Sequence, residues 1–140
     1  MRLNMQLVDI RILTIEFHLN KDFREEKDRL TFNTDIAIRN DFIEENNELF
    51  VFVKLKQKSG NVPFFFEIEG GGRFKFDKTP DKKTLDAFAT INCPAIIFPY
   101  IRETIADITR RAGFPPLHIG PVNFIELSKT RKKETAKRKQ

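Results

Sequence analysis

Three features of the sequence carry residue types that often do chemistry: one cysteine, two histidines and a run of three glycines. Cys93 lies at the start of a predicted helix, where the pKa of a thiol tends to fall, but no base can be paired with it. His18 and His118 lie on different predicted elements, without the clustered ligands of a zinc site. We therefore expect a small buried cysteine, surface or hydrogen-bonded histidines, no metal and no cofactor.

The glycine run, Gly70 to Gly72, invites comparison with a phosphate-binding loop. Such a loop needs a following Lys-Ser/Thr and a strand-to-helix junction, whereas Phe74 and Phe76 continue a strand pattern. The run instead favours a bulge or a close backbone approach. With no catalytic constellation in the chain, the sequence predicts a protein that is not an enzyme.

The elements that position these residues belong to one domain, as the length of 140 residues predicts. Hydrophobic residues make up 40% and charged residues 32%, which is typical of a globular protein. The longest uncharged run, residues 87–101, contains two prolines and is shorter than the roughly 20 apolar residues of a membrane span. The N-terminus has no apolar signal segment, so we expect a cytoplasmic protein.

The basic charge is concentrated at the C-terminus. From Lys129 onward there are seven Lys/Arg and one Glu, which leaves 18 basic and 19 acidic residues before it. We expect a domain over residues 1–128 and a basic, disordered tail over residues 129–140. Such a tail could bind nucleic acid through salt-dependent attraction, but the neutral body makes this the weaker function class.

Alternating apolar residues predict four strands, over residues 6–19, 30–39, 49–58 and 62–76. The alternation breaks at Leu13, which indicates a bulge. Acidic and Asn residues predict a loop over residues 40–48. Because the connections look short, we expect an antiparallel meander.

A helix is predicted from a cap at Asn92 to about Ala112, with Gly113 ending it. Pro99 should kink or restart this helix. A proline-rich crossover follows, and Asn123 is expected to cap a second helix over residues 124–132. One face of the long helix is apolar, and its residues are Ile97, Ile101, Ile105 and Ile108.

The second face of the sheet is unusual because it carries Phe50, Phe52 and Phe65 among lysines and glutamates. Exposing a phenylalanine forfeits about 1.5–3 kcal/mol relative to burying it. Several on one small surface therefore indicate an interaction site. Packing within the subunit, or between identical subunits, is the alternative interpretation.

The motifs between residues 92 and 124 resemble those of the SecB protein-export chaperone family. They are Cys93-Pro, Phe98-Pro-Tyr-x-Arg-Glu, Gly113-Phe-Pro-Pro-Leu and Pro121-Val-Asn-Phe, in family order and spacing. Residues 64–74 are also similar to the last strand of the family. The resemblance implies an α+β fold, a four-stranded antiparallel sheet with two helices packed on one side, assembled as a dimer of dimers.

The resemblance also implies a function, an ATP-independent holdase that keeps unfolded precursor polypeptides competent for export. The long-helix face Ile97, Ile101, Ile105 and Ile108 is then expected at a subunit interface. The alternation of side chains along the strands and the groove of the family together predict client contacts from six residues. They are Phe50, Phe52 and Phe65 on the sheet, and Phe114, Leu117 and Leu127 in the crossover and second helix.

Two departures from the family pattern concern the SecA motor, which binds acidic positions on the sheet. Glu67 matches one such position, but Thr14 and His18 occupy the first-strand positions. The tail is basic where the family's is acidic, and like charges oppose docking of a basic partner. A SecB-like chaperone that protects the antitoxin of a toxin–antitoxin system is therefore the alternative.

Overall fold

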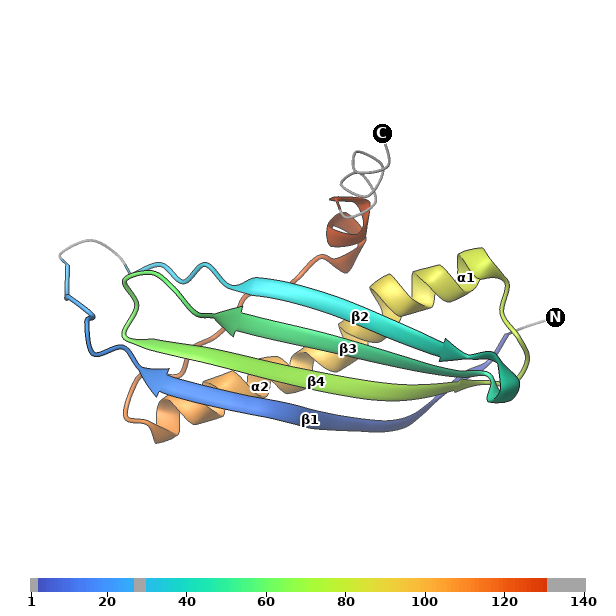
Figure 1. The fold of residues 1–140 in the computed structure, drawn as a ribbon, viewed down its shortest axis with the longest axis horizontal. Coiled ribbons are helices and arrows are strands. Elements are labelled where there is room, and N and C mark those ends of the chain that lie inside the picture. The colour runs from blue at the N-terminus through green and yellow to red at the C-terminus, as the bar shows by residue number, and fades with distance from the viewer. Residues whose placement is uncertain (1–2, 27–29, 131–140) are drawn as a thin grey trace.

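The computed structural model describes residues 3–26 and 30–130, which form one sheet crossed on one side by a long helix (Figure 1). The strands are β1 (Met5–Leu19), β2 (Asp35–Ile43), β3 (Glu48–Gln57) and β4 (Phe64–Phe76). All neighbouring strands are antiparallel. The predicted α+β fold with a four-stranded antiparallel sheet is confirmed.

The strand order is not the predicted meander. Across the sheet the order is β1-β4-β3-β2, so β1 pairs with β4 instead of β2. Short connections join β2, β3 and β4, while residues 20–34 carry the chain from one edge of the sheet to the other, a Greek-key arrangement. The meander was wrong because it treated this long connection as hairpin-length.

Strand β1 contains two bulges. Its register with β4 shifts between Leu7 and Asp9 and again between Ile12 and Thr14, which confirms the bulge expected at Leu13. On either side of that bulge Ile12 pairs with Gly70 and Ile15 with Ile68. The extra residue therefore keeps the apolar side chains of both halves on one face of the sheet.

Strand β2 lies further along the chain than predicted. Residues 40–43, expected in a loop, continue the strand, and Phe42 pairs with Leu49. Residues 30–34 precede the strand. The connection from β2 to β3 is the short helix η1 (Glu44–Asn46), followed by Asn47 at φ 54°. Because β2 is an edge strand, charged residues such as Asp41 are compatible with it.

The long helix begins earlier than predicted, and Asn92 does not cap it. The carboxylate of Asp81 accepts a hydrogen bond from the Thr84 N–H at 2.7 Å and caps α1 (Lys82–Ala87). The chain continues through a π-helical turn, η2 (Phe88–Asn92), into α2 (Cys93–Arg111). The wider turn lies just before Pro94, which lacks the N–H of a regular helical turn.

Helix α2 continues through Pro99, so the expected restart there is wrong. Burial of Phe98 and Ile101 on either side of this proline holds the helix against the sheet. The helical segment Lys82–Arg111 is long and apolar enough to cross a membrane by length and composition alone, a test that the core helix of a soluble protein also passes. Here one face of α2 packs on the strands.

We call the sheet face that contacts α2 the inner face. Ile97, Ile101 and Ile105 are fully buried against it. A Cβ atom added at Gly70 would lie 3.1 Å from Ile97 Cγ2, and one added at Gly72 would lie 2.7 Å from Phe74 Cε2. The expected close backbone approach at the glycine run is therefore confirmed.

This packing corrects the predicted oligomer interface. Ile97, Ile101 and Ile105 have no exposed area left for a partner, because the subunit's own sheet covers them. Only Ile108 of the predicted set is partly exposed. The helical periodicity was correct, but it marks the core of one subunit.

The C-terminal part of the fold is a crossover, residues 112–123, followed by a helix from residue 124 to the last described residue, 130. Gly113, at φ 97°, follows the end of α2, as expected. The side chain of Asn123 accepts a hydrogen bond from the Glu126 N–H at 3.1 Å, which confirms the second cap. Most of the predicted tail, residues 131–140, lies outside the described residues.

Candidate functional site

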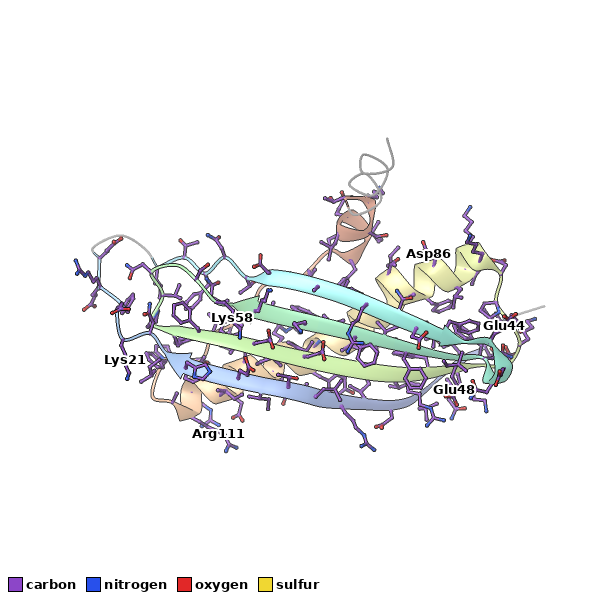
Figure 2. All side chains as sticks on the ribbon, viewed as in Figure 1. Lys21, Glu44, Glu48, Lys58, Asp86 and Arg111 are labelled. Atoms are coloured by element: carbon purple, nitrogen blue, oxygen red, sulfur yellow. The ribbon has the colours of Figure 1, made fainter. Side chains whose placement is uncertain are left out.

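The outer face of the sheet, opposite α2, carries aromatic residues and charges along its length. In Figure 2, Glu48 and Lys58 mark the two ends of β3 on this sheet. The strand register places Phe52 beside Gly71 and Phe50 beside Arg73. Phe50 and Phe52 line a cavity of about 170 Å³ that also includes Leu13 of the β1 bulge.

Phe65 does not join this cavity. It pairs with His18 of β1, beyond the rows that contain Glu67 and Glu69. Phe50, Phe52 and Phe65 are all partly exposed on the outer face, as the strand parity predicted, but charged residues divide them into two sites.

Ion pairs balance the acidic residues of the outer face. Glu69 has Arg39 at 3.5 Å and Lys54 at 3.9 Å, and Glu67 lies 3.9 Å from the Lys58 amine. The same amine donates a 2.7 Å hydrogen bond to Glu16, which lowers the pKa of that carboxyl. The predicted motor-contact residue Glu67 therefore belongs to a mixed-charge surface.

A larger groove, lined by both apolar and polar side chains, lies along the crossover. Two cavities, of about 520 and 460 Å³, share Leu30 and Thr31 and run between residues 23–26 and 30–34 on one side and residues 114–120 on the other. We call them together the crossover groove. Its apolar lining residues are Phe23, Leu30, Phe32, Pro63, Phe114, Leu117 and Ile119.

Two of the predicted client residues, Phe114 and Leu117, line this groove. The Phe114 ring lies 5.0 Å from the Phe64 ring, which anchors the crossover to the inner face. Leu127 packs partly buried against the core, and the neighbouring Phe124 lies 5.9 Å from Phe98. The structure thus brings Phe114 and Leu117 together and leaves Phe50, Phe52 and Phe65 on the opposite face.

Sequence reasoning missed the groove residues from the connection between β1 and β2. Phe23, Leu30 and Phe32 lie far from the crossover in sequence but face it in the fold. Phe23 was an apolar residue within the predicted charged connection, residues 20–29, and Leu30 and Phe32 were assigned to the alternation of the second strand. Only the corrected strand order shows why they meet the crossover.

The cysteine and the two histidines do not form a reactive site. Cys93 is fully buried, and burial raises the pKa of its thiol to about 12. Both histidines are exposed. Within residues 3–26 and 30–130, no group of three or more His, Cys, Asp or Glu side chains could hold a metal ion. The site offers apolar surface interspersed with polar and charged side chains.

Comparison with known proteins agrees with this geometry. The family model described as preprotein translocase subunit SecB matches residues 2–135. The chain belongs to the SecB family.

Curated SecB relatives cover different shares of the chain. The protein-export protein SecB of Burkholderia lata is 33% identical over 135 residues, which is 91% of this chain and 81% of the relative. The SecB of Methylobacillus flagellatus is 41% identical over 91 residues, 64% of this chain and 57% of the relative. The SecB of Acidithiobacillus ferrooxidans is 40% identical over 81 residues, so the match spans only about half of that relative, 54%.

Solved structures share the SecB-like fold. The SecB-like chaperone of Mycobacterium tuberculosis, solved with a ChAD peptide from the HigA1 antitoxin, matches with a TM-score of 0.69 at 21% identity, over 84% of this chain and 90% of that one. A Streptococcus agalactiae protein of unknown function matches with a TM-score of 0.55 at 10% identity, over 86% of this chain and 100% of that one.

Proposed function

We propose that this SecB-family protein is an ATP-independent holdase that binds unfolded precursor polypeptides and keeps them competent for export. The observation that carries the proposal is the crossover groove, in which seven apolar side chains lie among polar ones such as Glu25, Asn61 and His118. Apolar contacts have low directional demand, so one groove accepts many sequences. The family is a chaperone family, and the protein needs no catalytic group.

The groove is large enough for several client side chains. Each buried apolar side chain contributes about 1.5–3 kcal/mol before the cost of ordering the client chain is subtracted. Single contacts are therefore weak, and binding depends on several contacts along one client. Phe50, Phe52 and Phe65 on the outer face, with Leu127, are proposed as further client contacts.

The assembly proposed is a homotetramer, a dimer of dimers. The structure supports the β1 edge as its interface, because β1 is a long edge strand with a free side. On the inner face of this strand Leu7, Ile15 and Leu19 are 42%, 54% and 60% exposed, and Tyr100 of α2 is 48% exposed. Soluble proteins seldom leave such an apolar strip uncovered, which supports a subunit interface there. We also propose that the protein is located in the cytoplasm.

The first test is aggregation of an unfolded client. We expect the full chain, without ATP, to suppress light scattering by chemically denatured citrate synthase diluted into buffer. Serum albumin at the same mass concentration is the control. Scattering that rises as fast with this protein as with albumin would rule out a holdase.

The second candidate is a chaperone dedicated to an antitoxin. It is favoured by the ion-paired outer face, where Glu67 and Glu69 lie beside basic side chains, and by the antitoxin peptide bound to a protein of the same fold. Affinity capture from the native host separates the two: the SecA motor and precursors support export, and one small antitoxin supports the alternative. RNA filter binding with and without residues 129–140 tests the nucleic-acid reading of the tail.

The groove assignment is tested by paired variants. Leu117→Ser with Ile119→Ser should weaken binding of a reduced, alkylated lysozyme about tenfold or more, since two apolar contacts are removed. Phe50→Ser with Phe65→Ser should weaken it less, because these rings lie on separate parts of the outer face. If the outer-face pair has no effect in a folded protein, those positions are not client contacts.

A further inference from the structure

One buried threonine of α2 makes two hydrogen bonds to the crossover that lines the groove. Thr109 is fully buried, at the C-terminal end of the apolar face of α2. Its hydroxyl accepts a hydrogen bond from the Leu117 N–H at 2.9 Å. The same hydroxyl donates to the Ile105 carbonyl at 2.8 Å, with the Ala106 carbonyl at 3.1 Å.

The backbone of Thr109 makes a second attachment. Its carbonyl accepts a hydrogen bond from the Phe114 N–H at 3.0 Å. Thr109 therefore holds the crossover at Phe114 and at Leu117, the two residues of the crossover groove that also lie in the predicted client set. Between these attachments the chain contains Pro115 and Pro116, which have no N–H to donate.

The hydroxyl is the only part of this arrangement that depends on the side chain. A valine at position 109 would keep the volume and the β-branch of threonine, and the Phe114 bond would remain because it uses the backbone. The Leu117 N–H, however, would lose its acceptor in a partly buried position, which is costly. The crossover around Leu117 would then be held less firmly against α2, although the Phe114 bond remains.

We propose that Thr109 is the positioning residue of the groove: its hydroxyl fixes where Leu117 lies and so sets the shape of the client-binding surface. This inference rests on the proposed function. Thr109 need not touch the client, because it acts through the Leu117 backbone. Helical periodicity does not explain why Thr109 lies on the isoleucine-rich face of α2, and this positioning role does.

Thr104 offers a matched control on the same helix. Its hydroxyl donates to the Tyr100 carbonyl at 2.7 Å, the same four-residue step back along the helix that Thr109 makes to Ile105. No crossover amide bonds to the Thr104 hydroxyl within the described residues. Thr104→Val therefore removes an equivalent helix hydrogen bond without releasing the crossover.

The experiment compares the full-length wild type, Thr109→Val, Thr109→Ser and Thr104→Val by amide hydrogen exchange and client binding. In Thr109→Val we expect exchange of the Leu117 amide to accelerate about tenfold or more, and the dissociation rate of reduced, alkylated lysozyme to rise several-fold. Thr109→Ser, which keeps the hydroxyl, and Thr104→Val should stay within about twofold of wild type. Thermal melts establish that all four proteins are folded.

Each outcome decides between the claims. If Thr109→Val and Thr104→Val show the same Leu117 exchange, the hydroxyl does not hold the crossover and the inference is overturned. If Leu117 exchange accelerates but lysozyme release is unchanged, Thr109 shapes the loop without shaping binding, which also overturns it. If the wild type itself does not bind lysozyme, the proposed function fails, while the exchange comparison still reports on the anchor.

Discussion

At the residue scale, an ion pair with a covered carboxylate joins Glu48 and Arg73 on the outer face. The two side chains form hydrogen bonds of 2.6 and 3.0 Å, and the Glu48 side chain is only 8% exposed. The hydrogen bond from Arg73 lowers the pKa of Glu48 below its ordinary value of 4.5. A carboxyl with a lowered pKa stabilises the folded state above its unfolded pKa, and this contribution is lost as pH falls through the folded pKa.

This pair predicts a pH-dependent stability. Glu48→Gln should lower the free energy of unfolding at pH 7, and its difference from wild type should shrink as pH drops below about 4.5, measured by urea unfolding. Glu45→Gln, an exposed carboxyl on the neighbouring turn, is the control and should change little. A difference for Glu48→Gln that is the same at pH 7 and pH 3 would show that the pair is not the source.

Residue type alone predicted that the cysteine and the histidines form no reactive site. It did not predict which polar side chains form hydrogen bonds between distant parts of the chain. The buried Cys93 and the exposed histidines followed from the missing partners in the sequence. The Glu48–Arg73 pair and the Thr109 bond to Leu117 did not, because each joins residues whose proximity depends on strand register or on the path of the crossover.

At the element scale, contact between β4 and α2 depends on the glycine run. A Cβ added at Gly72 would lie 2.7 Å from Phe74 Cε2 and 3.1 Å from Ile97 Cδ1, distances that require these buried side chains to move. Overpacking of this kind costs about 1–3 kcal/mol.

Gly72→Ala should therefore destabilise the protein by about 1–3 kcal/mol in equilibrium urea unfolding. Gly120→Ala provides the comparison, because no atom lies within 4 Å of a Cβ built there. Equal stabilities of the two variants would mean that Phe74 and Ile97 do not pack as close to Gly72 as the structure shows.

Periodicity predicted the strands, the β1 bulge and the buried face of α2, since each is a local pattern of apolar residues. It did not predict the strand order. Whether β1 lies beside β2 or β4 depends on the path of the charged connection between β1 and β2. No periodic pattern in the sequence indicates that path. The position of the crossover groove follows from the same path, so five of its seven apolar lining residues were missed.

At the scale of the whole molecule, the exposed strip along β1 predicts that subunits associate there. Ile15→Asp should convert the proposed tetramer to a smaller species in size-exclusion chromatography with light scattering, because a charge would be buried in an apolar interface. Ile43→Asp is the control, since Ile43 is exposed at the opposite edge of the sheet, on β2. A wild-type mass for Ile15→Asp would place the interface elsewhere.

The proposed binding site for unfolded chains is the groove between residues 30–34 and the crossover. It is tested most directly by site-specific photo-cross-linking, with benzoylphenylalanine placed at Leu117, at Phe50 on the outer face and at the exposed Lys83 of α1 as a background site. With reduced, alkylated lysozyme, we predict strong cross-links from position 117 that native lysozyme does not give, weaker ones from position 50, and none above background from position 83. Equal capture from positions 117 and 83 would contradict the account.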